Sequence, residues 1–109
     1  MKVNNKIKSI LGFAMKAGAI ASGEVGCMSQ VKKNKAYLVI VAEDASQNTK
    51  KLFGDKTAFR KIPIRFTGTK EELGKTIGKN PRAVVAIKDK GFAVKLIEVI
   101  DQEGFIGGD

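Results

Sequence analysis

The middle of the chain holds a nearly unbroken run of apolar and β-branched residues, AYLVIVA at positions 36–42. A strand with one exposed face usually alternates apolar and polar side chains, whereas a strand covered on both faces does not. The run therefore predicts a central strand that is buried on both sides. Because helices or a second sheet must provide that cover, the remaining segments decide the fold class.

Shorter patterns on either side of this strand predict helices and further strands in alternation. Apolar residues at three- and four-residue spacing predict helices over residues 4–17, 22–34, 46–59, 69–77 and 93–100. Short apolar runs predict strands at residues 19–21, 62–66 and 83–87. We therefore expect an α/β fold, a three-layer α/β/α sandwich in which about five helices cover a mixed, mainly parallel sheet of about four strands.

The sequence also predicts how the helices begin and which side chains they bury. Asn4 or Asn5, Ser22 and Ser46 are expected to cap the first three helices, and Thr69 to begin the fourth. The third helix is expected to bury Thr49, Leu52, Phe53 and Phe59. Most aromatic residues are assigned to the core, namely Tyr37, Phe53, Phe59 and Phe66. Few aromatic side chains would then remain to stack on unpaired bases.

Length and cysteine content indicate one intracellular domain. A chain of 109 residues suits a single domain with a modest core, which we expect over residues 1–103, followed by a flexible tail at 104–109. The single cysteine, Cys27, cannot form an internal disulfide and is expected to face the core as a small apolar side chain. The chain has no histidine, and no stretch resembles a signal peptide or membrane span, so we expect a cytoplasmic protein without metal or cofactor.

Positive charge is in excess and unevenly distributed. Twenty Lys and Arg stand against eleven Asp and Glu, which gives a formal charge of +9. Residues 1–79 carry sixteen basic and six acidic side chains, while residues 80–109 carry four and five. Such a field attracts polyanions through counterion release, and a nucleic acid is the polyanion we expect. Charge that serves only solubility is the alternative.

Two sequence patterns resemble a nucleotide-binding loop and a catalytic pair of carboxylates, but neither fits in detail. Residues 68–76, GTKEELGKT, end like a phosphate-binding loop, but five residues separate its glycines where that loop has four, and its two glutamates would repel phosphate. Glu43 and Asp44 are adjacent, so their side chains would diverge at the end of a strand. Asp44 is expected to shape the turn or cap the next helix. No catalysis is therefore expected.

Basic side chains fall at the ends of predicted elements. Lys32, Lys33 and Lys35 follow the second helix, whereas Lys79 and Arg82 flank an Asn-Pro step before the last strand. With the expected sheet, these side chains would converge on one rim. Such a rim favours structured RNA, recognised through its backbone and shape rather than by stacking of single strands.

Several short segments follow one another as they do in a known family. They are AG at 17–18, SGE at 22–24, LVIVAEDA at 38–45, ELGK at 72–75 with Gly78, and VVAI at 84–87. Their order resembles the L-seven-Ae ribosomal protein family over roughly residues 4–100, and most of all its bacterial YlxQ-like branch. The resemblance implies an α/β/α sandwich that binds kink-turn or similarly bent RNA as a monomer, in association with the ribosome or translation.

The resemblance also implies where RNA would bind. In the family, the helix that opens after a glycine contacts the sheared G·A pairs of the kink, and the loop before the last strand covers a flipped-out base. The matching positions here are Gly23, Glu24, Val25, Gly26, Ser29, Lys79, Asn80, Pro81 and Arg82, to which the basic rim adds Lys32 and Lys33.

The chain departs from the family's usual pattern at this site. Val25-Gly26 stand where kink-turn binders usually carry a polar pair, and Ser29 stands where they carry a lysine. We therefore expect a weaker or different RNA target, contacted mainly through phosphates. One alternative is a protein-interaction module on a ribonucleoprotein that has altered or lost kink-turn specificity. Another, the RNA-docking part of a methyltransferase, rests on fold analogy alone and predicts no activity for this chain.

Overall fold

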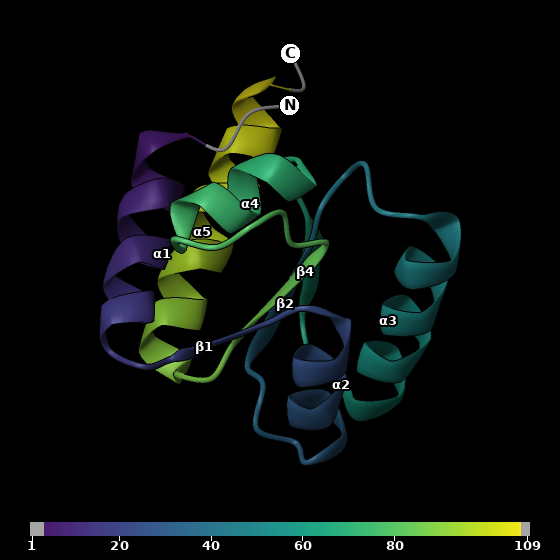
Figure 1. The fold of residues 1–109 in the computed structure, drawn as a ribbon. Helices are drawn as coiled ribbons and strands as arrows, with labels where there is room; N and C mark the ends of the chain where they lie inside the picture. Colours follow the sequence, from purple (N-terminus) through teal and green to yellow (C-terminus); the bar gives the residue numbers. More distant parts are fainter. Residues whose placement is uncertain (1–3, 108–109) are drawn as a thin grey trace.

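The helices and strands alternate along the chain as the sequence predicts (Figure 1). The computed structural model describes the backbone of residues 4–107 and the side chains of residues 4–103. Its elements in order are α1 (Asn5–Lys16), β1 (Ile20–Ser22), α2 (Glu24–Lys32), β2 (Leu38–Val41), α3 (Gln47–Arg60), β3 (Ile64–Phe66), α4 (Lys70–Thr76), β4 (Val84–Ile87) and α5 (Lys90–Gly107).

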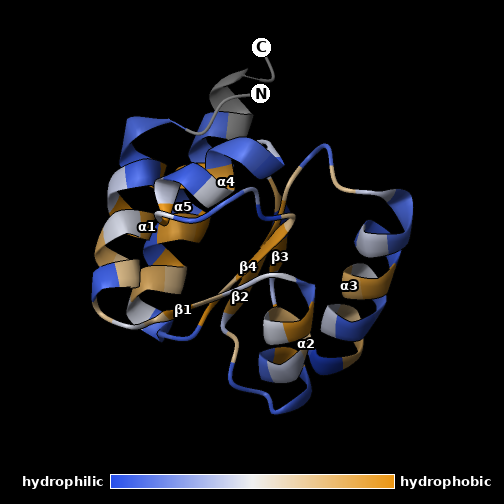
Figure 2. Cartoon of the chain, in the orientation of Figure 1, coloured by the Kyte–Doolittle hydropathy of each residue, from blue (hydrophilic) through white to orange (hydrophobic). Residues whose placement is uncertain are grey.

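The sheet is covered by helices on both faces, which confirms the α/β/α sandwich. Its strand order is β1-β4-β2-β3, and every residue of the two central strands, β2 and β4, is buried. Helices α1, α4 and α5 lie on one side of the sheet and α2 and α3 on the other (Figure 1). Figure 2 shows the central strands uniformly hydrophobic between helices whose outer faces are hydrophilic. The run at 36–42 thus forms the centre of the core.

The prediction of a mainly parallel sheet is wrong. Only β2 and β3 pair in parallel, whereas β4 runs antiparallel to both β1 and β2. A parallel return requires a connection that runs back along the whole sheet. The connection from β3 to β4, residues 67–83, instead returns to the end of the sheet where β3 stops: the amide of Arg82, after α4, donates to the carbonyl of Lys70, at the start of α4, at 2.9 Å. The chain therefore enters β4 at that same end and runs in the opposite direction.

Three of the predicted helix starts are confirmed and one is wrong. Asn4 and Ser46 accept hydrogen bonds from the amides three residues later, at 2.8 and 3.1 Å, and Thr69 forms a reciprocal capping box with Glu72. Ser22, however, is the last residue of β1. Helix α2 begins instead after Gly23, whose φ of 82° lies in a region that glycine adopts far more easily than other residues.

The assignment of the aromatic residues to the core is largely wrong. Phe53 is fully buried, but Phe59 is 82% exposed and Tyr37 and Phe66 are about half exposed. The reason lies in the spacing along α3, where the buried stripe is Thr49, Phe53 and Thr57, one residue per turn. Leu52 and Phe59 lie beside that stripe, so they face solvent.

The last helix is longer than predicted. Helix α5 continues to Gly107, into the segment expected to form a flexible tail, and residues 108–109 lie outside the described residues. Its buried side chains are Ala93, Leu96 and Ile100, at the expected spacing. None of the helices within residues 4–107 combines the length and apolar composition required to cross a lipid bilayer.

Candidate nucleic-acid interface

The pairing of β1 with β4 brings two distant segments of the chain together. Ser22 lies opposite Val85, and the amide of Gly23 donates to the carbonyl of Val84 at 3.0 Å. The start of α2 therefore lies beside the loop that precedes β4. We call the combined surface, residues 23–33 and 79–82, the α2 edge. It contains the eleven residues assigned to the RNA site in the sequence, whereas Lys35 of the expected basic rim lies just beyond it.

Arg82 fastens the loop to the sheet. Its Nε donates to Ser22 Oγ at 3.2 Å, and its Nη1 donates to the carbonyls of Asn80 and Pro81 at 3.1 and 3.2 Å. A guanidinium with three of its five donors in use fixes the loop backbone and keeps Nη2 for a ligand. Arg82 is thus first a brace for the loop, a role that the sequence does not indicate.

Gly74 supports the same loop from below. The amide of Lys79 donates to the Gly74 carbonyl at 2.7 Å. A Cβ on Gly74 would lie 2.1 Å from the carbonyl oxygen of Asn80 and 2.8 Å from Cα of Pro81. The loop backbone therefore rests directly on α4, which explains the glycine of the ELGK segment and leaves Lys79, Asn80 and Pro81 exposed on the outside.

The first turn of α2 presents uncapped backbone donors. Gly23 provides no side chain to cap the helix, and the first amides of a helix have no partner within it. Together with the helix dipole, such amides attract anions such as phosphate. Glu24 is the one acidic residue of this turn, while Val25 and Gly26 offer no polar side chain. Backbone amides rather than side chains are therefore the donors at this end of the α2 edge.

A shallow groove of about 600 Å³ runs along α2 toward α3. Its walls are Glu24, Val25, Met28, Ser29, Lys32, Lys33 and Leu52. Val25 is 87% exposed and lies at the start of the groove, and Met28 and Leu52 continue its apolar lining toward the two lysines. Neither Met28 nor Leu52 is among the predicted site residues: Met28 packs partly buried against the core, whereas Leu52, expected to be buried, is 39% exposed. Their positions beside the buried stripes, rather than on them, were the available evidence.

The basic side chains of the α2 edge do not form one cluster. Lys79 and Arg82 lie at the start of α2, whereas Lys32 ends the helix and Lys33 is its C-cap. Nine helical residues, about 13 Å, separate the two ends, and the groove connects them. The expected single rim is therefore a strip with positive charge at each end. Within residues 4–103 none of these cations forms an ion pair.

Cys27 lies behind this strip and is buried as predicted. Its Sγ donates to the carbonyl of Ala21 at 3.4 Å, and burial raises the pKa of the thiol from 9.0 to about 12. The thiol stays protonated at neutral pH, so it is neither a nucleophile nor a metal ligand there.

The segments considered for chemistry have structural roles. Asp44 lies in the turn after β2, one of its two expected roles, and its Oδ1 accepts from the amide of Lys70, the first residue of α4, at 2.8 Å. The other expected role, capping α3, is wrong, because Ser46 caps that helix. In the phosphate-loop-like segment, the Glu72 carboxylate accepts from the Thr69 amide at 3.2 Å. Residues 70–76 form helix α4, so this segment is a helix with a capping box and not a loop around a phosphate.

The fold and these segments identify the family. The chain belongs to the ribosomal protein L7Ae/L30e/S12e/Gadd45 family, whose model matches residues 5–97. It is 41% identical over 92 residues to the RNA-binding protein YlxQ of Bacillus subtilis strain 168, which covers 84% of this chain and 92% of that protein. The protein of the same name from Enterococcus faecium is 40% identical over 96 residues, 88% of this chain and 92% of that one. The predicted resemblance is confirmed.

Solved structures share the fold. A protein of unknown function from Bacillus halodurans has a TM-score of 0.87 at 38% identity, covering 90% of this chain and 99% of that one. A 15.5 kD RNA binding protein from Giardia lamblia has a TM-score of 0.77 at 22% identity, covering 93% of this chain and 92% of that one. At that identity the Giardia protein shows the common fold alone.

Proposed function

We propose that this chain is a non-catalytic, cytoplasmic RNA-binding protein that holds structured RNA at the α2 edge. The observation that supports this proposal is the uncapped start of α2, which lies next to the exposed loop that Arg82 braces and that contains Lys79. Backbone amides at a helix start and basic side chains around them form a phosphate-binding arrangement. The names of the YlxQ relatives support RNA as the ligand.

The geometry favours recognition of backbone and shape over recognition of base edges. Val25 and Gly26 have no side-chain donor or acceptor, so hydrogen bonds from this turn come from the main chain. The apolar lining of the groove, formed by Val25, Met28 and Leu52, suits the flat face of an unstacked base. Lys32 and Lys33 then contact phosphates at the far end. We infer weak base specificity and strong dependence on RNA shape.

The target that fits these features is a sharply bent RNA helix of the kink-turn type, bound by one copy of the chain in the setting of the ribosome or translation. A bend is what brings phosphates from two helical arms within reach of one small protein. Residues 1–103 form the RNA-binding domain in this proposal, and it uses no metal or cofactor.

The test is a binding titration with three RNAs of equal length. A kink-turn RNA, the same RNA with its sheared pairs replaced by Watson–Crick pairs, and an unpaired strand are each titrated at several salt concentrations. We expect the kink-turn to bind at least tenfold more tightly than the straight duplex at physiological salt. Equal affinity for the bent and the straight RNA would contradict shape recognition at the α2 edge.

One observation favours a second function. Val25 is 87% exposed and continues into an apolar strip with Met28 and Leu52, which is also typical of a surface that binds a protein helix. In that case the chain would be a protein-interaction module on a ribonucleoprotein. Capture of a defined protein after nuclease treatment, lost in Leu52→Ser, is the result expected of that function and not of RNA binding.

A further inference from the structure

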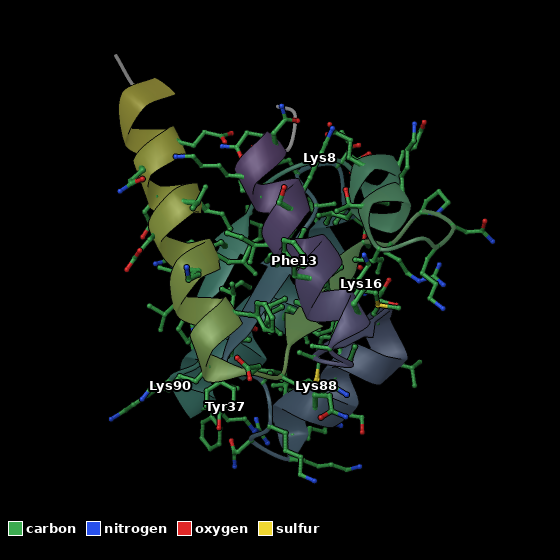
Figure 3. All side chains as sticks on the ribbon, turned by 90° about the vertical axis from the view of Figure 1, so that its left-hand side faces the viewer. Lys8, Phe13, Lys16, Tyr37, Lys88 and Lys90 are labelled. Carbon is green, nitrogen blue, oxygen red and sulfur yellow. The ribbon has the colours of Figure 1, made fainter. Side chains whose placement is uncertain are left out.

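Two exposed aromatic side chains lie away from the α2 edge. Phe13, on α1, is 63% exposed, and Tyr37, just before β2, is 47% exposed. Figure 3 shows both in one view, Phe13 on α1 with Lys16 near it, and Tyr37 at the lower end of the molecule with Lys88 and Lys90 near it. We call these five residues the Phe13–Tyr37 face. The proposed function assigns them no role.

Backbone hydrogen bonds hold this face together. The amide of Lys88 donates to the carbonyl of Ala19 at 2.7 Å, which places it beside the turn that follows α1. The amide of Tyr37 donates to the carbonyl of Ile87 at 2.8 Å, so Tyr37 lies on the other side of Lys88. Phe13 and Lys16 are three residues apart on α1 and therefore share one face of that helix.

The Phe13–Tyr37 face and the start of α2 lie at opposite ends of the sheet. Strand β4 leads from Val84, next to Gly23, to Ile87, next to Tyr37 and Lys88. Four strand residues span roughly 13 Å. Lys33, at the other end of α2, comes four residues before Tyr37 and lies toward the Phe13–Tyr37 face. Variants at the start of α2 and variants of the Phe13–Tyr37 face therefore test the two surfaces separately.

The charge of this face is positive, because its three lysines outnumber the one carboxylate that follows Lys88 in sequence, Asp89. Lys16, Lys88 and Lys90 are exposed, and none of them is in an ion pair within residues 4–103. The acidic neighbour in sequence, Asp89, accepts a hydrogen bond from the amide of Phe92 at 3.0 Å and so caps α5. Lys8, farther along α1, lies beside Glu71 and Glu72, so we exclude it from the face.

The combination of exposed aromatic rings and lysines favours one class of partner over a protein or an RNA duplex. Protein interfaces are enriched in aromatic residues and arginine but depleted in lysine, and every cation of this face is lysine. A duplex presents its phosphates but hides its bases, which leaves exposed rings without a role. An unpaired strand uses both features, because bases of any sequence stack on aromatic rings and the phosphates pair with the flexible lysine ammonium groups.

We propose that the Phe13–Tyr37 face binds an unpaired RNA strand, with bases stacked on the two rings and phosphates at the three lysines. The face is a second RNA-contacting surface, distinct from the α2 edge. A chain with both surfaces holds a folded RNA element and an adjoining single strand at once, which lengthens the effective site without any change in the fold.

The molecule carries its own probe for this interaction. It has one tyrosine and no tryptophan, so its intrinsic fluorescence reports Tyr37. Stacking of a base on that ring is expected to quench the emission as oligouridine of about twelve nucleotides is added to the full chain. Phe13→Ala and Lys88→Ala should each shift the midpoint by about tenfold, in line with one stacking contact or one lost phosphate contact at low salt.

Matched variants separate stacking from other effects. Because the Tyr37 variants lack the fluorescent ring, their binding is measured with a fluorescently labelled strand. Tyr37→Phe should retain affinity because the aromatic ring remains, whereas Tyr37→Ala should lose it. Phe59→Ala is the control for an exposed ring elsewhere, since Phe59 lies on α3 under the guanidinium of Arg60. Circular dichroism confirms that each variant is folded.

Each outcome supports or overturns the proposal. It fails if saturating oligouridine leaves the emission unchanged, or if Phe13→Ala binds the strand as the wild type does. Loss of a protein partner by the face variants with unchanged strand affinity would identify a protein-binding surface instead. The affinity of each variant for kink-turn RNA is measured in parallel. Variants of the Phe13–Tyr37 face are expected to keep this affinity. Its loss is expected only in variants of the α2 edge, so that measurement tests the proposed function and not the binding of an unpaired strand.

Discussion

Gly74 supports the loop of the α2 edge, and the structure leaves no room for a side chain at this position. The loop backbone at Asn80 and Pro81 occupies the space of any side chain there. Gly74→Ala should destabilise the fold by about 1–3 kcal/mol, the usual effect of overpacking. It should also weaken RNA binding, because the loop must move. Urea unfolding and an RNA titration measure the two effects.

The control for that prediction is another helical glycine. A Cβ on Gly54, within α3, would meet nothing within 4 Å. Gly54→Ala should therefore stabilise the protein by about 0.5–1 kcal/mol through helix propensity and leave RNA binding unchanged. If both alanine variants behave alike, the close packing at Gly74 has no energetic consequence.

Cys27 predicts an alkaline loss of stability. Its pKa is raised from 9.0 to about 12 by burial, so the folded chain holds the thiol proton more tightly than the unfolded chain. Its contribution is complete below pH 9 and declines as pH rises toward 12, by up to about 1.4 kcal/mol per pH unit. In urea unfolding at pH 8 and 10.5, wild type should lose more stability than Cys27→Ala. Equal losses would show that the thiol does not titrate in this window.

Sequence patterns predicted single residues well where a local rule governs them. Ser46 and Thr69 cap helices because the bonds join residues three apart, a distance that the sequence itself displays. Leu52 and Phe59 were misplaced because their burial depends on which stripe of α3 faces its neighbour, and that rotation is set by tertiary packing. The bracing role of Arg82 depends on the β1–β4 pairing in the same way.

At the scale of elements, α2 carries the candidate site because its start is uncapped. A negative side chain in that first turn should occupy the amides that phosphate would otherwise approach. Val25→Glu is therefore expected to lower RNA affinity by about tenfold while leaving the helix as stable or more stable, a combination that rules out unfolding as the cause. The two measurements are an RNA titration and a thermal melt.

Val94→Glu provides the matched control on another element. Val94 lies on α5 and is 46% exposed, so the substitution makes the same change of charge far from α2. We expect little change in RNA affinity. An equal loss in both variants would mean that overall charge, and not the start of α2, determines binding.

The order of elements was predictable, whereas their directions were not. Strands and helices can be recognised in a sequence because their apolar residues recur with periods of two and 3.6 residues, respectively. The antiparallel course of β4 depends on how the connection at residues 67–83 folds back, with the amide of Arg82 bonded to the carbonyl of Lys70, and this contact is not visible in the sequence. The candidate site was located in outline because β1, α2 and the loop before β4 belong to a recognisable set of segments, yet the groove required the packing of α3.

For the whole molecule, the net charge of +9 predicts steep dependence on salt. Lys33→Ala should weaken binding to every RNA and reduce the slope of log affinity against log salt by about one unit, because one phosphate contact is lost. Lys95→Ala, a change of the same charge on α5, should leave the slope nearly unchanged. Affinity is measured between 50 and 300 mM salt, in the range where screening is strong. An unchanged slope for Lys33→Ala would remove that side chain from the interface.

The central claim is that RNA docks on the start of α2 and the loop beside it. The most direct measurement is an amide chemical-shift titration of the isotopically labelled protein with kink-turn RNA. We predict the largest shifts at the amides of residues 24–26, moving in the direction expected for new hydrogen bonds to phosphate, and smaller shifts at the amides of Lys79, Asn80 and Arg82 in the loop beside them. Shifts confined to α5 and the outer face of α3, with residues 24–26 unmoved at saturation, would contradict it.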